Sequence, residues 1–201
     1  MSASRQPLRT FFALWPRDAV RTELARRAAS VAKACGGRAT YAGLLHLTLM
    51  FTGATPRERL PALSQLMDAV DVPAFVLDLD AIGWFRHNGV VWAGTRKTPE
   101  PLLALHAALQ RGAERLGFSL DVRPYAPHLT LARDASRGPP AVALASLPWD
   151  VRSFVLVSSQ LAPTGPRYEI LHERALDRPA RTRSAAGARQ EHDGNAAAAG
   201  G

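Results

Sequence analysis

His46-Leu47-Thr48-Leu49 and His128-Leu129-Thr130-Leu131 are two copies of one tetrapeptide, 82 residues apart in the chain. Each copy is typical of a short β-strand, in which successive side chains point to opposite faces of a sheet. Each histidine therefore shares a face with its own threonine, while the leucines point into a core. Two such strands side by side place two imidazoles and two hydroxyls around one cleft. From this duplication we predict both the fold and the site.

The residues around the two motifs alternate between strand and helix patterns. Apolar residues recur at helical spacing in three segments, so we expect helices at 18–34, 56–70 and 99–116. Short apolar or alternating runs predict strands at 9–15, 45–51, 73–82, 90–95, 128–132, 152–161 and 167–175. His87-Asn88-Gly89 is a hairpin-turn signal between two of these strands. Helices in alternation with antiparallel hairpins predict an α+β fold.

Each copy of the motif follows a predicted helix, and each half of the chain contributes one copy. We therefore predict one bilobal domain over residues 1–178, in which a pseudo-twofold axis relates two lobes that share a cleft, with the helices outside. Residues 179–201 are rich in Arg, Ser, Gly and Ala. Such a composition buries too little apolar surface to order the chain, so we expect a disordered tail there.

The basic composition favours an anionic partner. The 201 residues carry a formal net charge of +8 and have a pI near 10.9, so polyanions are natural partners. Lys33 and Lys97 are the only lysines among 25 basic residues. An Arg- and Ala-rich composition is also typical of a GC-rich genome, so both explanations of the charge stay open.

Cysteine usage and hydropathy restrict the compartment. Cys35 is the only cysteine, which excludes an intrachain disulfide and a cysteine zinc cluster and fits a reducing cytoplasm. No apolar segment approaches the length of a membrane span, so no membrane partner is expected. We therefore expect a cytoplasmic protein.

Two histidines on neighbouring strands can act as an acid/base pair near neutral pH, because the ordinary pKa of histidine is about 6.5. In-line attack on a phosphodiester needs a base on one side of phosphorus and an acid on the other, which predicts a bell-shaped dependence of rate on pH. Thr48 and Thr130 can donate hydrogen bonds to the non-bridging oxygens. Arg133 can clamp the same phosphate if the strand ends or bulges, because in a straight strand its parity is opposite to that of His128.

Other catalytic chemistries lack their motifs in this sequence. It has no Gly-x-x-x-x-Gly-Lys-Ser/Thr loop for ATP, no His-Glu-x-x-His helix for zinc and no Gly-x-Ser-x-Gly elbow. Threonine is a poor partner for a hydrolytic zinc centre, so we expect no metal and no cofactor. Phe12, Trp84 and Tyr125 are candidates to stack on a terminal base. His87 is expected in a solvated turn and His106 within a helix.

Four segments carry a resemblance to a known family: Arg9-Thr-Phe-Phe-Ala, Leu45-His-Leu-Thr-Leu, Val90-Val-Trp-Ala-Gly and Arg123-Pro-Tyr-Ala-Pro-His-Leu-Thr-Leu-Ala-Arg. With them the chain resembles the two-histidine phosphoesterases, and more closely the bacterial RNA 2′,3′-cyclic phosphodiesterases, also named 2′-5′ RNA ligases. The resemblance spans roughly Leu8 to Leu176, and Pro127 before the second histidine matches the family pattern. It implies two antiparallel sheets that face a central cleft.

The resemblance also implies an activity and a role for each motif residue. Members of the family open a terminal 2′,3′-cyclic phosphate on RNA and leave a 2′-phosphomonoester. By that resemblance His128 is the general base that activates water, and His46 is the general acid that protonates the departing 3′ oxygen. Thr48, Thr130 and Arg133 hold the phosphate. The reverse reaction, 2′-5′ ligation, needs no ATP, and whether it matters in the cell stays open.

The expected partner is an RNA end with a cyclic phosphate, such as a tRNA fragment, bound by a monomer without a metal. Two alternatives stay open. The same site can serve small cyclic nucleotides or 2′-5′-linked oligonucleotides, or the cleft can bind RNA ends without chemistry. Turnover of a mononucleotide against that of an RNA end separates the first alternative, and binding without turnover would indicate the second.

Overall fold

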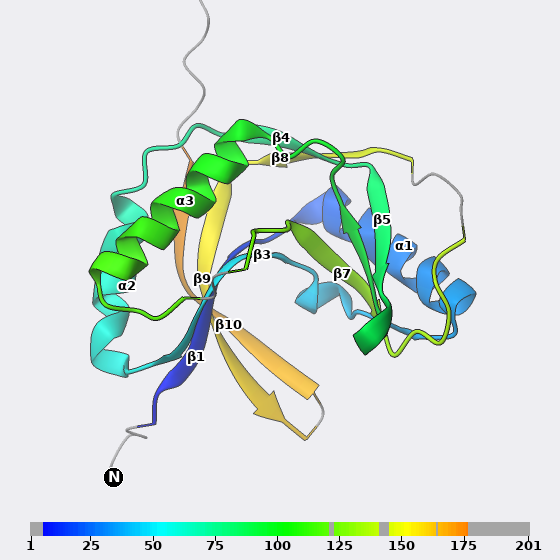
Figure 1. Cartoon of the computed structure of the whole chain (residues 1–201), viewed down its shortest axis with the longest axis horizontal. Coiled ribbons are helices and arrows are strands. Elements are labelled where there is room, and N and C mark those ends of the chain that lie inside the picture. The colour runs from blue at the N-terminus through cyan, green and yellow to red at the C-terminus, as the bar shows by residue number, and fades with distance from the viewer. Residues whose placement is uncertain (1–5, 121–122, 141–144, 164, 177–201) are drawn as a thin grey trace, which may run out of the picture.

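The computed structural model describes residues 6–120, 123–140, 145–163 and 165–176, and its main feature is a curved antiparallel sheet (Figure 1). In this part of the chain the sheet has eight strands, seven of them in the order β10-β9-β1-β3-β7-β6-β5, and the short β2 pairs with β7. The strands are β1 (Leu8–Leu14), β2 (Arg38–Ala39), β3 (Leu47–Thr55), β5 (Ala81–Phe85), β6 (Val90–Gly94), β7 (His128–Arg133), β9 (Ser153–Ala162) and β10 (Gly165–Ala175). A second sheet pairs β4 (Phe75–Leu79) with β8 (Leu147–Val151). A mixed α and β fold with antiparallel sheets is thus confirmed.

The two motif strands lie side by side at the centre of the main sheet. β3 and β7 pair antiparallel, with Leu47 opposite Leu129, and β1 and β6 flank the pair on its two sides. In an antiparallel register of this kind, a residue before one leucine faces the residue after the other. The register therefore sets each motif histidine opposite the threonine of the other motif, and the expected pairing of the two motifs is confirmed.

The leucines of both motifs lie at the centre of the hydrophobic core. Leu47, Leu129 and Leu131 are fully buried, and Leu49 is 2% exposed. The histidines and threonines on the opposite face of the same strands are only partly buried. Burial of one leucine side chain contributes roughly 1.5–3 kcal/mol, and a slip of one residue would turn the histidines into the core. The predicted alternation is confirmed, and it fixes the register of the pair.

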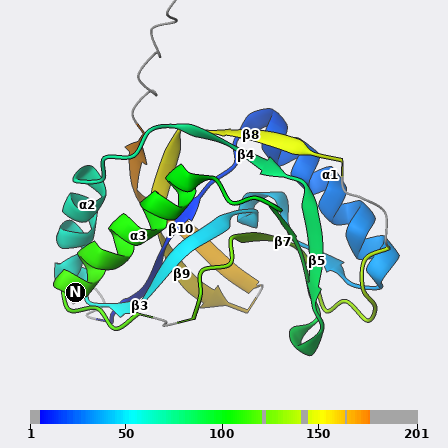
Figure 2. The same ribbon diagram turned by 45° about the horizontal axis from the view of Figure 1, so that its top comes forward.

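Three α-helices among the described residues cover the core (Figures 1 and 2). α1 (Asp18–Cys35) lies at one end of the molecule, and α2 (Leu60–Asp68) and α3 (Glu100–Arg115) lie together at the other end. The helices predicted from apolar spacing are confirmed, except that residues 57–59 form a 3₁₀ turn ahead of α2. Across the described ranges, each helix is too short or too polar to cross a membrane.

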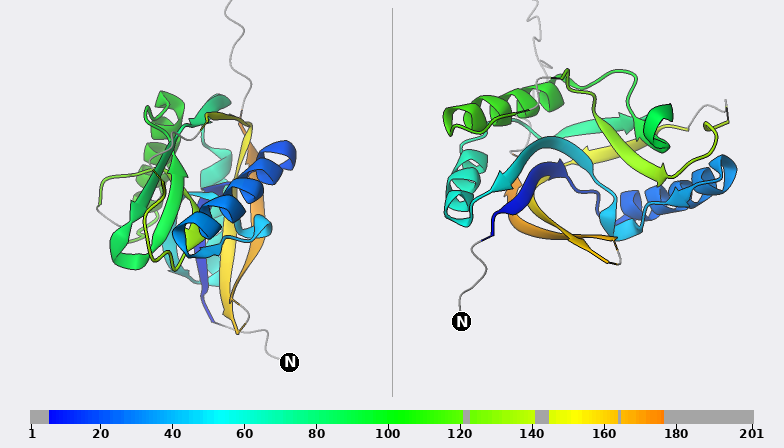
Figure 3. Two further views of the ribbon diagram at one scale, coloured as in Figure 1. Left: turned by 90° about the vertical axis from the view of Figure 1, so that its right-hand side faces the viewer. Right: turned by 60° about the horizontal axis from the view of Figure 1, so that its bottom comes forward.

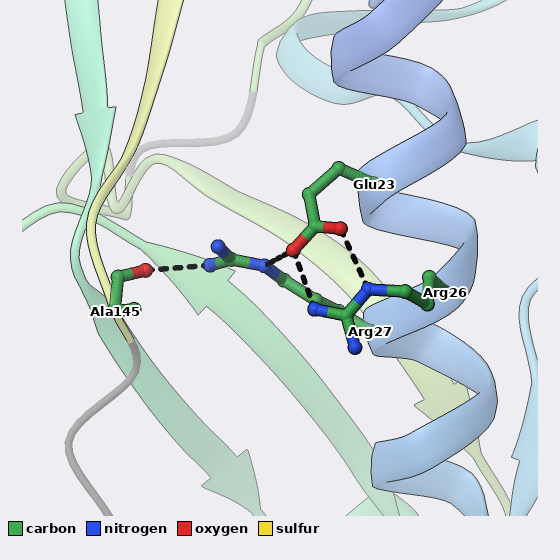
Figure 4. A network of polar contacts seen from close by, with 4 residues as sticks. All are labelled: Glu23, Arg26, Arg27 and Ala145. Carbon is green, nitrogen blue, oxygen red and sulfur yellow. Dashed lines mark hydrogen bonds and ion pairs between the residues drawn. The ribbon is translucent and has the colours of Figure 1, made fainter.

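A group of polar contacts fastens α1 to the segment before β8 (Figure 4). Glu23 accepts hydrogen bonds from Arg26 and Arg27, each at 2.7 Å, and Arg27 also donates to the carbonyl oxygen of Ala145 at 2.6 Å. The hydrogen bonds from Arg26 and then Arg27 hold the pKa of Glu23 at about 2. The contact joins α1, which packs against β7, to the second sheet.

The single strand expected at 73–82 is wrong. The chain forms β4 and β5 instead, which belong to different sheets and meet at Asp80. The carboxylate of Asp80 accepts a hydrogen bond from the backbone N–H of Arg96 at 2.8 Å, and the backbone N–H of Asp80 donates to the carbonyl oxygen of Gly94 at 3.1 Å. These contacts hold the chain at the point where it passes from one sheet to the other. β8 is a further strand that the pattern does not predict, because Pro148 interrupts its apolar run.

The β9–β10 hairpin continues the main sheet beyond β1 (Figure 3). β1 pairs with β9 on one side and with β3 on the other, and β1 and β3 curve together. Register shifts between β1 and β3 mark bulges, which bend strands. The tail predicted at 179–201 lies outside the described residues.

Candidate active site

A pocket of about 540 Å³ opens on the face of the sheet that carries the motif side chains. Thr48, His128, Thr130 and Arg133 line this pocket, and they come from both motif strands. His46 is not part of the lining but lies beside it, because the register sets it opposite Thr130. The structure therefore brings four of the five expected residues into one pocket and places the fifth next to them.

The two motif histidines are held in the same way. Nδ1 of His46 lies 2.7 Å from the carbonyl oxygen of Leu44, and Nδ1 of His128 lies 2.8 Å from the carbonyl oxygen of Ala126. A carbonyl oxygen only accepts hydrogen bonds, so each Nδ1 carries a proton. In the neutral ring Nε2 is then the unprotonated nitrogen, able to take up a proton and to return it. The contact with the carbonyl two residues earlier recurs in both copies of the motif.

Aromatic rings surround His46. Its imidazole stacks on Trp15, with centroids 5.4 Å apart and 12° between the planes, and Phe11 and Tyr168 lie 5.1 and 5.2 Å away. Burial among these rings lowers the pKa of His46 to about 4, and the positive charge of Arg133 acts in the same direction. The imidazole is therefore neutral at pH 7 in the free protein. No sequence pattern linked these three rings to the first motif.

Arg133 reaches the pocket because β7 bulges after its threonine. β6 advances by one residue, from Trp92 to Val91, while β7 advances by two, from Thr130 to Ala132. Two consecutive residues of β7 are buried at this point, so the alternation of its side chains resumes one residue late. Arg133 thereby lies on the same face of the strand as His128. The bulge that the sequence analysis required for Arg133 to reach the site is present.

Of the three aromatic residues expected to stack on a base, Tyr125 lines the pocket and the other two do not. Phe12 is 0% exposed and belongs to the core, because it points to the face of β1 opposite Phe11. Trp84 packs against the same core, and its indole nitrogen has no hydrogen-bond partner within the described ranges. Phe12 and Trp84 are therefore wrong as candidates.

The turn after β5 forms one wall of the pocket. Phe85 at the end of β5 and His87 and Asn88 of the turn line it, and the ring of Phe85 meets that of His128 edge-on, with centroids 5.2 Å apart. Gly89 closes the turn with a φ of 64°, a left-handed conformation that glycine adopts without strain. His87 lies in the expected turn, but the pattern gave no sign that the turn borders the site.

Helix α3 and the segment before the second motif form the opposite wall. His106 stacks on Tyr125, with centroids 4.0 Å apart and 6° between the planes, and its Nδ1 donates to the carbonyl oxygen of Leu49 at 2.9 Å. The sequence places His106 correctly within a helix and does not reveal that it lines the pocket. His172 lies outside the lining and contacts the carboxylate of Asp68 at 3.0 Å.

The groups of the pocket that can exchange protons near pH 7 are imidazoles. Burial raises the pKa of Tyr125, so its phenol stays protonated at neutral pH. Cys35 is buried away from the pocket, and burial also raises the pKa of its thiol. Among the residues that the structure describes, no three His, Cys, Asp or Glu side chains gather as a metal site requires.

A doubled histidine motif at the centre of an antiparallel sheet, beside a pocket with threonine hydroxyls and an arginine, is the arrangement expected of a two-histidine phosphoesterase. A family model agrees with this expectation. The chain belongs to the 2′-5′ RNA ligase superfamily, whose model matches residues 16–162.

The chain is similar over most of its length to proteins from two bacteria. The chain is 35% identical to the RNA 2′,3′-cyclic phosphodiesterase of Escherichia coli over 175 residues, which is 85% of this chain and 98% of that protein. It is 35% identical to the protein of the same name from Thermus thermophilus over 183 residues, covering 84% and 90%. The crystal structure of E. coli LigT in its apo form has a TM-score of 0.76 at 35% identity, over 86% of this chain and 99% of LigT. LigT complexed with phosphate gives a TM-score of 0.74 at 33% identity over the same shares.

Proposed function

We propose that this protein hydrolyses the 2′,3′-cyclic phosphate at the end of an RNA to a 2′-phosphomonoester, with His46 and His128 as its acid/base pair. The observation that carries the proposal is the antiparallel pairing of Leu47 with Leu129, which sets each motif histidine opposite the other motif's threonine beside one pocket. The relatives named RNA 2′,3′-cyclic phosphodiesterase support the same substrate.

Hydrolysis removes one proton from water and delivers one to the departing 3′ oxygen. We assign the first transfer to His128, which lines the pocket and whose Nδ1 is committed to a carbonyl oxygen, so that Nε2 takes the proton. The water oxygen bonds to phosphorus while the bond from phosphorus to the 3′ oxygen breaks. His46 donates its proton to that oxygen, which leaves a 3′-hydroxyl and a 2′-phosphate. Exchange of one proton with solvent at each imidazole restores the starting state.

The proposed acid must be protonated when it acts, whereas burial keeps His46 neutral at pH 7 in the free protein. A cyclic phosphate carries a negative charge, and a negative charge beside an imidazole favours the imidazolium form. We therefore expect substrate binding to raise the pKa of His46. In this mechanism the acid becomes charged only when a phosphate is present to receive its proton.

The remaining motif residues hold the phosphate. Thr48 and Thr130 supply hydroxyl donors, and Arg133 supplies a guanidinium that the bulge in β7 turns toward the pocket. These donors stabilise the charge that gathers on the non-bridging oxygens in the transition state, where such groups have their largest effect. The proton transfers are met by imidazoles, so the proposed reaction needs no metal ion.

We also propose an internal symmetry for the domain and a range of substrates for the site. The sheet order, with β9 and β1 beyond one motif strand and β6 and β5 beyond the other, supports two lobes related by a pseudo-twofold axis. We propose residues 1–178 as the functional domain, acting as a monomer in the cytoplasm on RNA ends such as tRNA fragments. Ligation would use the same groups, with a 5′-hydroxyl in place of water.

The test is turnover of an RNA oligonucleotide that ends in a 2′,3′-cyclic phosphate, in excess EDTA, with phosphorus NMR to locate the product phosphate. We expect a 2′-phosphate from the wild type. His46→Ala and His128→Ala should each lose about 10²- to 10⁴-fold in kcat/KM, the range typical of one general acid or base. His172→Ala is the matched control, because this histidine pairs with Asp68 outside the pocket lining.

Full activity in either motif variant would contradict the assignment of roles. Turnover of a cyclic mononucleotide without turnover of the RNA end would favour a phosphodiesterase for small nucleotides. Binding of RNA ends by a wild type that shows no turnover on any cyclic phosphate would indicate a binding module instead.

A further inference from the structure

A second arginine lies directly opposite Arg133. β2 pairs with the end of β7, and its register sets Arg38 against Arg133. Directly opposed residues of an antiparallel pair share one face of the sheet, with Cβ atoms about 4.5–5.5 Å apart. Arg38 is therefore on the face that carries the motif histidines, at the rim of the pocket that Arg133 lines. Like charges directly opposite each other destabilise a sheet, so this pair favours an anion beside it.

One carboxylate offsets part of this charge. Asp134 directly follows Arg133 and accepts a hydrogen bond from Nη2 of Arg38 at 2.8 Å. The φ of Asp134 is 57°, a left-handed conformation that aspartate adopts more readily than most residues. This turn ends β7 and sets the carboxylate beside Arg38. One carboxylate against two guanidinium groups leaves the three side chains with a net positive charge.

A glycine lets β2 approach the end of the motif strand. Gly36 ends α1 with a φ of 64°, and Gly37 follows it directly before β2. A Cβ atom on Gly37 would lie 2.7 Å from the carbonyl oxygen of Arg133, closer than a Cβ atom approaches such an oxygen. Only glycine fits at this position without a shift of the backbone. The sequence Gly-Gly-Arg thereby brings Arg38 to Arg133.

We propose that Arg38 binds a second phosphate of the substrate, the phosphodiester that joins the terminal nucleotide to the one before it. The assignment rests on the proposed function and specifies its substrate as an RNA chain rather than a cyclic mononucleotide. Arg133 holds the cyclic phosphate, and the next phosphate of an RNA chain is one nucleotide away. Two long side chains that start from opposed positions can hold both phosphates at once. The hydrogen bond to Asp134 occupies one of the five N–H donors of Arg38 and fixes the direction of its side chain.

The experiment compares kcat/KM on three substrates. These are uridine 2′,3′-cyclic phosphate, a uridine dinucleotide with the same cyclic end, and that dinucleotide with an uncharged methylphosphonate as its internal linkage. The wild type should prefer the charged dinucleotide to the mononucleotide, and the uncharged linkage should remove most of this preference. Arg38→Ala should lower the ratio of dinucleotide to mononucleotide kcat/KM by about five- to tenfold, the effect of one charge-assisted contact at an exposed site. Arg38→Lys keeps the charge and should retain most of the ratio.

Arg152→Ala is the matched control. Arg152 is also an exposed arginine that pairs with one carboxylate, that of Asp150, at 2.5 Å, and it lies outside the pocket lining. Its removal takes the same charge from the protein and should leave the ratio unchanged. An equal fall of the ratio in both arginine variants would show an effect of net charge alone and would overturn the inference.

Three other results would overturn it as well: a wild type that does not prefer the dinucleotide, a preference that survives the uncharged linkage, or an unchanged ratio in Arg38→Ala. A wild type that cleaves none of the three substrates would refute the proposed function instead. Calorimetry with the 2′-phosphate products of the mononucleotide and the charged dinucleotide then tests the second phosphate site without turnover. The dinucleotide product should bind more tightly, and Arg38→Ala should remove that difference.

Discussion

Acidification should destabilise this protein through one imidazole, that of His46. Burial among three aromatic rings lowers its pKa to about 4, and the charge of Arg133 acts in the same direction. In the unfolded chain the same group titrates near its ordinary pKa of about 6.5. Between these two values the unfolded chain binds a proton that the folded protein does not, so the free energy of unfolding falls as the pH falls.

The size of the effect follows from the gap between the two pKa values. Each pKa unit corresponds to about 1.36 kcal/mol, so a gap of about 2.5 units corresponds to about 3 kcal/mol. The sign is that of a base with a depressed pKa in the folded state. The contribution is complete above pH 6.5, and it is lost as the pH falls from about 6.5 to about 4. A loss of this size is a large fraction of the 5–15 kcal/mol typical of a folded domain.

Urea unfolding of the wild type and of His46→Asn at pH 7 and pH 4 isolates this contribution. Asparagine has no charge at either pH, and its amide can still donate to the carbonyl oxygen of Leu44. Carboxylates such as Glu23 titrate in both proteins and cancel in the difference. We expect the wild type to lose about 3 kcal/mol more than the variant over this range. An equal loss in both proteins would refute the reasoning, and an NMR titration of the His46 ring in the folded protein with a midpoint near 6.5 would do the same.

Two further predictions concern the centre of the sheet. Leu129→Ala removes a fully buried side chain opposite Leu47 and should lower the free energy of unfolding by about 2–5 kcal/mol. Leu161→Ala, on a side chain that is 91% exposed, should change it little. Similar urea midpoints for the two variants would contradict the core assignment. Arg133→Lys keeps the positive charge in the pocket but loses the planar guanidinium, which can donate two parallel hydrogen bonds to a phosphate. We expect kcat/KM on a cyclic phosphate to fall roughly tenfold or more while the melting temperature stays unchanged. An unaltered kcat/KM would show that Arg133 serves only as a charge.

The pairing of the motif strands and the positions of the helices follow from the sequence, because each rests on a period that packing enforces. Leucines alternate with polar residues in both motifs, and a core that takes Leu47 and Leu129 leaves one face for the histidines. The helices carry apolar residues on one stripe each, and these stripes pack into the core.

Two strand assignments fail for reasons that a local pattern does not contain. Alternation runs on from β4 into β5, but Asp80 between them uses its carboxylate and its N–H to turn the chain toward a different sheet. β8 carries Pro148, which pattern reasoning counts against a strand. This proline is tolerated because β8 pairs with β4 alone among the described strands.

The first strand shows why the sequence does not identify the aromatic residues of the site. β1 is buried on both faces over most of its length, so Phe11 and Phe12 look alike in a run of apolar residues. Neighbouring side chains point to opposite faces, and the structure turns Phe11 toward His46 and Phe12 into the core. Which of the two contacts the site depends on the pairing of β1 with β3, a contact between segments about 40 residues apart.

The bulges after the two threonines determine which side chains lie beside the motif histidines. A straight strand would send the third residue after each threonine into the core, where a guanidinium has no partner and is costly to bury. One extra residue in each motif strand instead puts Arg133 and Phe51 beside the histidines, at equivalent positions on the two sides of one seam. Because both strands bulge directly after the threonine while the residues they deliver differ, the backbone supports a symmetric pair of acid/base groups and the side chains make the pocket asymmetric.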